Sequence, residues 1–175
     1  DVADYLRQHH PERYAELRQN IGAAFQKAYV RGDGGIGNDS QTSYILALHF
    51  GLLPEALRPL AAKKLADDIV GRGYRLNTGF LGTPYILDAL ADHGHEDVAV
   101  ALLKQTAFPS WGHMVTKGAT TVWERWNGDT GDVAMNSYNH YAFGAVAGFL
   151  YRRLAAIEPL TPGFERIRIR PLDDA

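Results

Sequence analysis

The sequence has no cysteine, and this absence excludes disulfides, thiolate metal sites and cysteine nucleophiles. It has no dense cluster of Lys and Arg, and its formal net charge is −2, so nucleic acid and anionic membrane surfaces are poor candidate partners. No apolar run approaches the roughly 18 to 20 residues that a membrane-spanning helix needs. The glycine-rich stretch 32–37 lacks the strand–loop–helix context of a nucleotide site, and no His, Asp or Glu group has metal-site spacing. We therefore expect no metal and no cofactor.

The first residues also lack an initiator Met and a signal-peptide pattern, which leads us to expect a fragment or a processed product. What is present is an ordinary globular composition, because 46% of the 175 residues are hydrophobic and 22% are charged. This length is sufficient for one domain with a sizeable core.

Hydrophobic periodicity predicts an all-α chain of about six helices of two alternating kinds. Helices with one polar face are expected at about 11–30, 59–70 and 96–105, and helices that are apolar around most of their circumference at about 40–50, 83–91 and 140–156. Two concentric layers of helices, visited alternately, would produce this order, so we predict an α/α barrel or a segment of one. A helical solenoid is the main alternative, although the helix pairs share little sequence.

Two local patterns refine this prediction. Thr83 and Pro84 are expected to be the N-cap and the first residue of the fourth helix. Near the end of the chain, basic and apolar residues alternate over 166–170, which predicts a short β-strand. No partner strand is evident, so we interpret it as the opening strand of a following β domain or as an edge strand docked elsewhere. The expected division is therefore 1–160 for the helical part and 161–175 for the start of the β domain.

The long connections lie at 31–39, 72–82 and 107–138, and each precedes a helix that is expected to be buried. In an alternating barrel these segments emerge at the same end, beside the N-termini of the inner helices. Long loops on a rigid scaffold commonly carry functional residues. We therefore expect the functional site at that end.

The longest connection contains all three tryptophans, Trp111, Trp123 and Trp126, together with Glu124. Sugars stack their C–H faces on indole rings and bind polar side chains through their hydroxyl groups, so a carboxylate among tryptophans is typical of a carbohydrate site. The alternative is that the tryptophans pack the loop while the carboxylate is solvated or ion-paired. His140, at the start of the last buried helix, is a candidate to donate to a sugar hydroxyl or to accept a proton; helix capping and core packing are its alternative role.

Four segments occur here in the order seen in bacterial α-L-rhamnosidases of glycoside hydrolase family 78. They are Thr-Gly-Phe-Leu-Gly-Thr-Pro at 78–84, Pro-Ser-Trp-Gly at 109–112, Thr-Thr-Val-Trp-Glu-Arg-Trp at 120–126 and Asn-His-Tyr-Ala-Phe-Gly at 139–144. The chain resembles this family over roughly 20–172. The third segment followed by Asn-His-Tyr is the most specific part of the resemblance.

The resemblance implies an (α/α)6 barrel followed by a β-sandwich, of which this chain would hold the C-terminal half of the barrel. It implies inverting hydrolysis of terminal α-L-rhamnose with Glu124 as the general base. His140 would contact the bound rhamnose, and Trp111 and Trp126 are candidates for the pocket wall. A rhamnose-containing glycoside would then be the partner.

An inverting enzyme needs a second carboxyl group as general acid, and in this family it lies in the earlier half of the barrel. That half is missing here, and nothing assigns the role to Asp129 or Asp132. We therefore expect the isolated chain to be inactive. Half a barrel would leave apolar helix flanks uncovered, which favours self-association or a complementary N-terminal half.

Two other functions remain open from the residues alone. The chain could be a non-catalytic helical module that binds a carbohydrate or a partner chain. It could also belong to another α/α-barrel glycosidase or to a polysaccharide lyase. A lyase must neutralise a uronate carboxylate, and the loops are not rich in Lys or Arg, which argues against that function.

Overall fold

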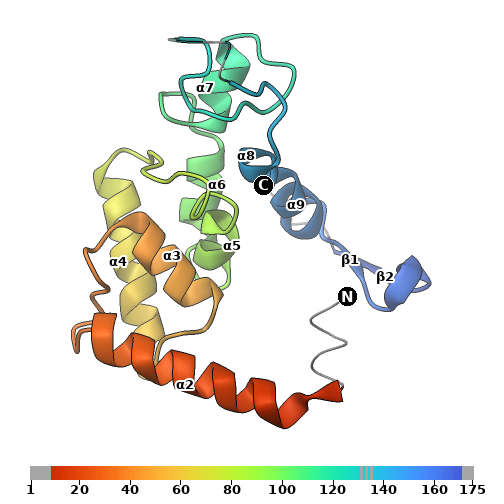
Figure 1. Ribbon diagram of the computed structural model, residues 1–175. Coiled ribbons are helices and arrows are strands. Elements are labelled where there is room, and N and C mark those ends of the chain that lie inside the picture. Colours follow the sequence, from red (N-terminus) through yellow and green to blue (C-terminus); the bar gives the residue numbers. More distant parts are fainter. Residues whose placement is uncertain (1–8, 131, 133, 135, 171–175) are drawn as a thin grey trace.

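The computed structural model describes residues 9–170 except 131, 133 and 135 (Figure 1). Residues 1–8 of the expected helical part and residues 171–175 of the expected β domain lie outside the described residues. The helices are α2 (Pro11–Tyr29), α3 (Gln41–His49), α4 (Arg58–Gly71), α5 (Ile86–Ala91), α6 (Glu96–Leu103), α7 (Trp111–Thr116), α8 (Tyr141–Gly144) and α9 (Val146–Phe149). A π-helical turn, Leu150–Leu154, and two short strands, β1 (Ile157–Pro159) and β2 (Ile167–Ile169), follow.

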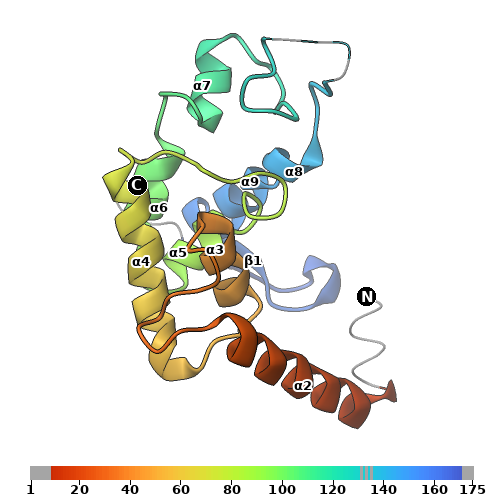
Figure 2. The ribbon, with the colours of Figure 1, turned by 60° about the vertical axis from the view of Figure 1, so that its left-hand side comes forward.

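The helices form two layers, as the periodicity predicts. The inner layer consists of α3, α5 and α9, in which α5 contacts both of the others. The outer helix α4 packs against α3, α5 and α6, and both views place it on the far side from α8 and α9 (Figures 1 and 2). The predicted α/α architecture is thereby confirmed for this part of the chain.

Burial follows the predicted helix faces in α4 and departs from them in α2. Ala61, Leu65 and Ile69 form the apolar face of α4, and none of them has solvent exposure. In α2, by contrast, no residue is buried, and Leu17 and Ile21 remain about half exposed, at 49% and 53%. The apolar stripe of α2 is therefore largely uncovered by the described residues.

The segment 107–138 contains a short helix, α7, so the expectation that it is loop throughout was wrong. The hydroxyl oxygen of Ser110 caps this helix by accepting the N–H of His113 at 2.9 Å. The expected helix start at Thr83 was also wrong, because α5 begins only at Ile86. The Thr83 hydroxyl instead hydrogen-bonds the hydroxyl of Thr78 at 2.7 Å, which closes a turn in the preceding loop.

The predicted strand at the end of the chain is present as β2, and its partner lies within the chain. β1 pairs with β2 in antiparallel register, with Ile157 opposite Ile169. The expectation of an unpaired strand was therefore wrong. With only three residues, including Glu158 and Pro159, β1 is too short for alternation to reveal it.

None of the described helices is both long and apolar enough to cross a membrane. Within the same part of the chain, no group of three or more His, Asp or Glu side chains could hold a metal ion.

Candidate active site

A cavity of about 310 Å3 lies where the loop before α5, the segment that follows α7 and the start of α8 meet. Its size is at the lower end of the range of roughly 300–1,000 Å3 that is usual for small-molecule sites. It is lined by Thr78, Gly79, Phe80, Phe108, Glu124, Arg125, Trp126, Asn127 and Phe143. Four aromatic rings and one carboxylate thus face the same space, which combines surface for sugar C–H groups with a group that can accept a proton.

The loop before α5 is held in place from α3. The buried Gln41 donates from Nε2 to the carbonyl oxygen of Arg75 at 3.2 Å. Its Oε1 accepts the N–H of Asn77 at 2.7 Å. This role could not be predicted from the sequence, because a glutamine on an otherwise apolar helix does not reveal which backbone groups it will hydrogen-bond. Two of the three long connections therefore meet at the end where the inner helices begin, as predicted.

Glu124 is held by backbone pairing with the segment that leads into α8. Its N–H donates to the carbonyl oxygen of Ser137 at 2.9 Å, and the Ser137 N–H donates to its Oε2 at 2.8 Å. The N–H of His140 donates to the carbonyl oxygen of Val122 at 2.9 Å in the same pairing. No described residue hydrogen-bonds Oε1, so that oxygen remains able to accept a proton from a bound molecule. Glu124 is also the only carboxylate among the described residues that line the cavity.

Trp126 is the one tryptophan of the three that lines this cavity in the described structure. Its indole stacks on Phe143, with ring centroids 4.0 Å apart and an angle of 12° between the planes. Its Nε1–H donates to the carbonyl oxygen of Thr78 at 3.0 Å. The ring is therefore fixed from two sides, and the cavity wall that it forms is rigid.

Trp111 lies behind this wall, at only 7% exposure. Its ring meets Trp126 edge-on, with centroids 5.5 Å apart, and its Nε1–H donates to the carbonyl oxygen of Phe143 at 2.9 Å. Trp123 is buried as well, in a small cluster with Met114 and Phe143. In this structure Trp111 and Trp123 thus support the wall from the core.

His140 is the N-cap of α8 and does not itself line this cavity. Its Nδ1 accepts the N–H of Ala142 at 3.2 Å, so the alternative capping role is present. Its ring is nearly parallel to Phe80, with centroids 4.9 Å apart and planes at 12°. Tyr141 stacks on it as well, at 5.1 Å and 16°. Phe80 connects His140 with the cavity that contains Glu124, because Phe80 lines that cavity.

The sequence reasoning missed the phenylalanines Phe80, Phe108 and Phe143. Phe80 and Phe143 lie inside two of the segments that carry the family resemblance, which was the one signal available for them. Phenylalanine is common in cores, so its type alone does not distinguish a cavity wall from ordinary packing.

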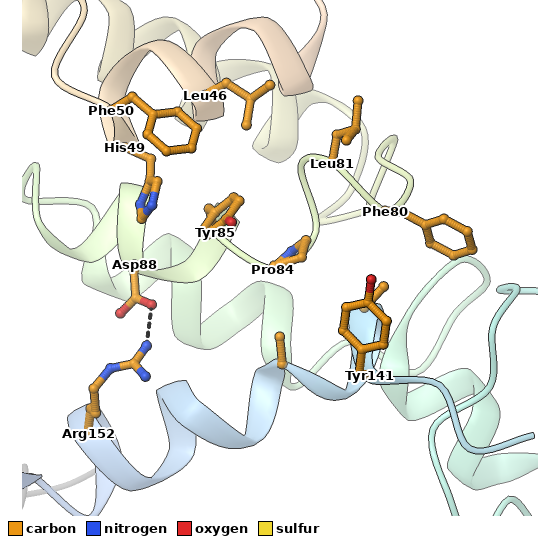
Figure 3. A pocket seen from close by; sticks show the side chains of 12 residues that line it. Leu46, His49, Phe50, Phe80, Leu81, Pro84, Tyr85, Asp88, Tyr141 and Arg152 are labelled. Atoms are coloured by element: carbon orange, nitrogen blue, oxygen red, sulfur yellow. Dashed lines mark hydrogen bonds and ion pairs between the residues drawn. The ribbon is translucent and has the colours of Figure 1, made fainter. Parts of the chain in front are cut away.

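A larger cavity of about 650 Å3 opens between the inner helices (Figure 3). Its walls come from α3, α5 and the segment α8–α9, and an ion pair of 2.7 Å between Asp88 and Arg152 closes one side of it. Three of its lining side chains are strongly exposed: Phe50 at 53%, Leu81 at 70% and Tyr141 at 86%. The inner face of the helical layer is therefore open and apolar in the described chain.

The first long connection, 31–39, is held by an electrostatic network of its own. The Tyr44 hydroxyl donates to Asp39, and Arg31 pairs with the same carboxylate. The Tyr44 hydroxyl, with help from Arg31 and the N–H of Ile36, keeps the pKa of Asp39 below its ordinary value. Burial, followed by the hydrogen bond to Asp39, raises the pKa of Tyr44. None of these residues lines the cavity with Glu124, and their role is to fix the loop that leads into α3.

Comparisons with known proteins identify the scaffold. Residues 1–154 match the family model described as the bacterial alpha-L-rhamnosidase 6 hairpin glycosidase domain. An alpha-L-rhamnosidase of Streptomyces avermitilis is 46% identical over 163 residues, which are 90% of this chain and 16% of the relative. One of Formosa agariphila is 38% identical over 93% of this chain and 18% of its own length.

Solved structures of alpha-L-rhamnosidases also match the fold of this chain. The Streptomyces avermitilis alpha-L-rhamnosidase complexed with L-rhamnose has a TM-score of 0.86 at 45% identity, and the match covers 92% of this chain and 16% of that one. The alpha-L-rhamnosidase of Aspergillus terreus has a TM-score of 0.84 at 35% identity and matches 92% of this chain and 19% of its own. The chain thus spans less than a fifth of the length of these relatives. Because the family model matches residues 1–154, the chain belongs to the six-hairpin glycosidase domain family of the bacterial α-L-rhamnosidases, a family of glycoside hydrolases.

Proposed function

We propose that this chain supplies the general base of an α-L-rhamnosidase that inverts the configuration at the anomeric carbon. The supporting observation is the setting of Glu124. Its carboxylate lies in a cavity with four aromatic rings. The Ser137 N–H donates a hydrogen bond to its Oε2, and no described residue donates one to its Oε1. A water molecule on Oε1 would lose a proton to the carboxylate while its oxygen attacks the anomeric carbon.

The leaving oxygen needs a proton from a carboxylic acid on the opposite face of the sugar, about 6.5–9.5 Å from the base. The described lining of the cavity contains no second carboxylate. Asp129, in the same segment, pairs with Lys117 at 3.3 Å, which does not favour it as a proton donor. The general acid therefore belongs to a part of the barrel outside this chain, and the isolated 175-residue chain is inactive towards rhamnosides.

The substrate in this proposal is a terminal, non-reducing α-L-rhamnose residue. Trp126 forms a flat, fixed wall for the C–H groups of the sugar, and His140, which stacks on Phe80 of the same cavity, donates to a hydroxyl group of the sugar. Trp111 acts indirectly, by holding Trp126 and Phe143 in place. L-Rhamnose is the ligand named in the structure of the Streptomyces avermitilis relative, which supports this class of sugar.

The proposal also implies a partner chain that covers the open inner face. The apolar space between α3, α5 and α8 would be covered by a complementary N-terminal half of the barrel or, in the isolated chain, by a second copy. A non-catalytic module that binds carbohydrate is the second candidate function, and the single carboxylate in the cavity is the observation that favours it.

The test is the substitution Glu124→Gln in a hybrid enzyme. The chain replaces the matching segment of the Streptomyces avermitilis α-L-rhamnosidase, and hydrolysis of an aryl α-L-rhamnoside is followed. Glutamine keeps the shape of the side chain but accepts no proton, so kcat should fall about a hundredfold to ten-thousandfold. Affinity for L-rhamnose should change little.

Asp129→Asn in the same segment is the matched control and should retain activity. Unchanged kcat in Glu124→Gln would refute the base assignment. A hybrid that binds L-rhamnose with no hydrolysis, while the unmodified relative is active under the same conditions, would favour the non-catalytic module instead. Proton NMR of the first-formed sugar tests inversion, because the β-anomer must appear first.

A further inference from the structure

The imidazole of His140 is fixed by three contacts, of which two are local in the sequence and one, with Phe80, is long-range. Its Nδ1 accepts the backbone N–H of Ala142 at 3.2 Å. Phe80 stacks on it at 4.9 Å with planes 12° apart, and Tyr141 stacks on it at 5.1 Å with planes 16° apart. A nitrogen that accepts a hydrogen bond carries no proton, so the neutral ring must carry its proton on Nε2.

We propose that Phe80 is a positioning residue that holds His140 as an Nε2–H donor towards the sugar. This inference rests on the proposed function, in which His140 contacts the substrate. Capping alone leaves the imidazole free to rotate away from Ala142, because a single hydrogen bond of 3.2 Å to Nδ1 does not hold the plane of the ring. A parallel aromatic ring fixes the plane, and the two constraints together fix the direction of the Nε2–H bond.

Phe80 is suited to this role because its own position is determined. Its ring meets Phe143 edge-on, with centroids 5.5 Å apart and planes at 61°. Two residues earlier, the carbonyl oxygen of Thr78 accepts the indole N–H of Trp126 at 3.0 Å. The loop that carries Phe80 is thus tied to the aromatic wall of the cavity at both its backbone and its side chain.

The stack also connects the donor with the base. Phe80 lines the cavity that contains Glu124, and it is 46% exposed, so its ring is accessible from that space. Tyr141 projects from α8 towards the loop that carries Phe80 (Figure 3). His140 and Glu124 lie on paired backbone segments, since the His140 N–H donates to Val122 at 2.9 Å. A shift of Phe80 would therefore change the direction of the donor while leaving the backbone of the base in place.

The deciding experiment needs no substrate. Long-range 1H–15N correlation spectra of the full chain report which imidazole nitrogen carries the proton, and His140→Gln assigns the His140 signals among the seven histidines. The wild-type chain should show the Nε2–H form of His140. Phe80→Leu should move both nitrogen shifts towards the averaged values of an imidazole that exchanges between its two neutral forms. Phe80→Tyr keeps an aromatic ring and should restore the wild-type spectrum.

The matched control is Phe108→Leu. Phe108 lines the same cavity and has a similar exposure of 47%, but its ring contacts His113, at 5.3 Å, and not His140 in the described structure. This variant should leave the His140 signals unchanged. In the hybrid enzyme, Phe80→Leu should raise KM about fivefold to tenfold, the loss of one ordered hydrogen bond, with a smaller change in kcat.

A wild-type His140 that carries its proton on Nδ1 would overturn the proposal. An unchanged His140 spectrum in Phe80→Leu, or an equal change in Phe108→Leu, would overturn it as well. These outcomes are separate from a failure of the proposed function. If the hybrid enzyme neither binds L-rhamnose nor hydrolyses a rhamnoside, the assignment of function fails, and the imidazole spectra alone still decide whether Phe80 orients His140.

Discussion

Glu124 and Ser137 exchange two hydrogen bonds, one between their backbones at 2.9 Å and one from the Ser137 N–H to the Glu124 Oε2 at 2.8 Å. The second bond aims the carboxylate, because it leaves Oε1 as the oxygen that faces a bound molecule. The backbone of a residue with no apparent chemical role thus orients the proposed base.

This relationship predicts different effects for two substitutions of Ser137. Ser137→Pro removes the N–H and should lower kcat of the hybrid enzyme about tenfold to hundredfold, as expected for one hydrogen bond to a charged group. Ser137→Ala retains the N–H and should lose little activity. Steady-state kinetics with an aryl rhamnoside measures both. An equal loss in the two variants would show that the hydroxyl group, and not the N–H, matters.

The loop before α5 depends on a close approach at Gly82. A Cβ atom there would lie 2.9 Å from the Thr42 hydroxyl oxygen and 3.1 Å from the Thr78 Cγ2. Gly82→Ala should therefore lower the free energy of unfolding by about 1–3 kcal/mol. Gly79→Ala is the matched control in the same loop, because a Cβ there meets nothing within 4 Å. Urea unfolding compares them, and equal midpoints would contradict the prediction.

The lowered pKa of Asp39 predicts a specific dependence of stability on pH. Its pKa is lowered, chiefly by the Tyr44 hydroxyl, so the folded protein binds this proton less readily than the unfolded chain. The stabilisation is present above the unfolded pKa of about 3.9 and is lost as the pH falls through the lower folded value. Asp39→Asn should destabilise the chain at pH 7, and the difference from wild type should shrink as the pH falls below about 3.9.

The variant preserves the backbone, because Asp39 has a φ of 57° and asparagine tolerates this left-handed conformation. Asp67→Asn is the control. Asp67 forms an exposed i,i+4 pair with Lys63, and such pairs contribute little to stability. Urea midpoints at pH 7 and below pH 3 test the prediction. A difference between Asp39→Asn and wild type that stays constant over this range would refute it.

The open inner face predicts that the isolated chain self-associates. Leu81 is 70% exposed and lines the large cavity between the inner helices, so Leu81→Asp should reduce association by placing a charge in an apolar contact. Leu160→Asp introduces the same charge beside β1, at a residue 42% exposed, and should leave association unchanged. Sedimentation velocity over a range of concentrations measures both. A wild-type chain that stays monomeric would contradict this expectation.

Helix periodicity predicted most of the fold, because burial of one face is a local property of the sequence. The helix expected at about 59–70 is present as α4, and its apolar stripe of Ala61, Leu65 and Ile69 is buried. The same reasoning failed for α7, which is short and amphipathic over too few residues for periodicity to show. It also failed for β1, which three residues define only through their pairing with β2.

The candidate site, too, was predictable from the sequence only in part. The sequence by itself identified Glu124, His140 and Trp126 as candidates, because their residue types carry the chemistry and the family segments contain them. It could not separate Trp126 from Trp111, since both lie in the connection 107–138 and only packing decides which ring lines the cavity.

Tertiary structure alone decided the geometry of the site. Phe80 is 60 positions from His140 in the chain, and Ser137 is 13 from Glu124, so neither contact follows from local spacing. Both arise because the loops before the inner helices converge at one end of the helical layers. The residue types thus determine which reactions the chain can support, and the long-range packing determines which side chains are oriented to take part in them.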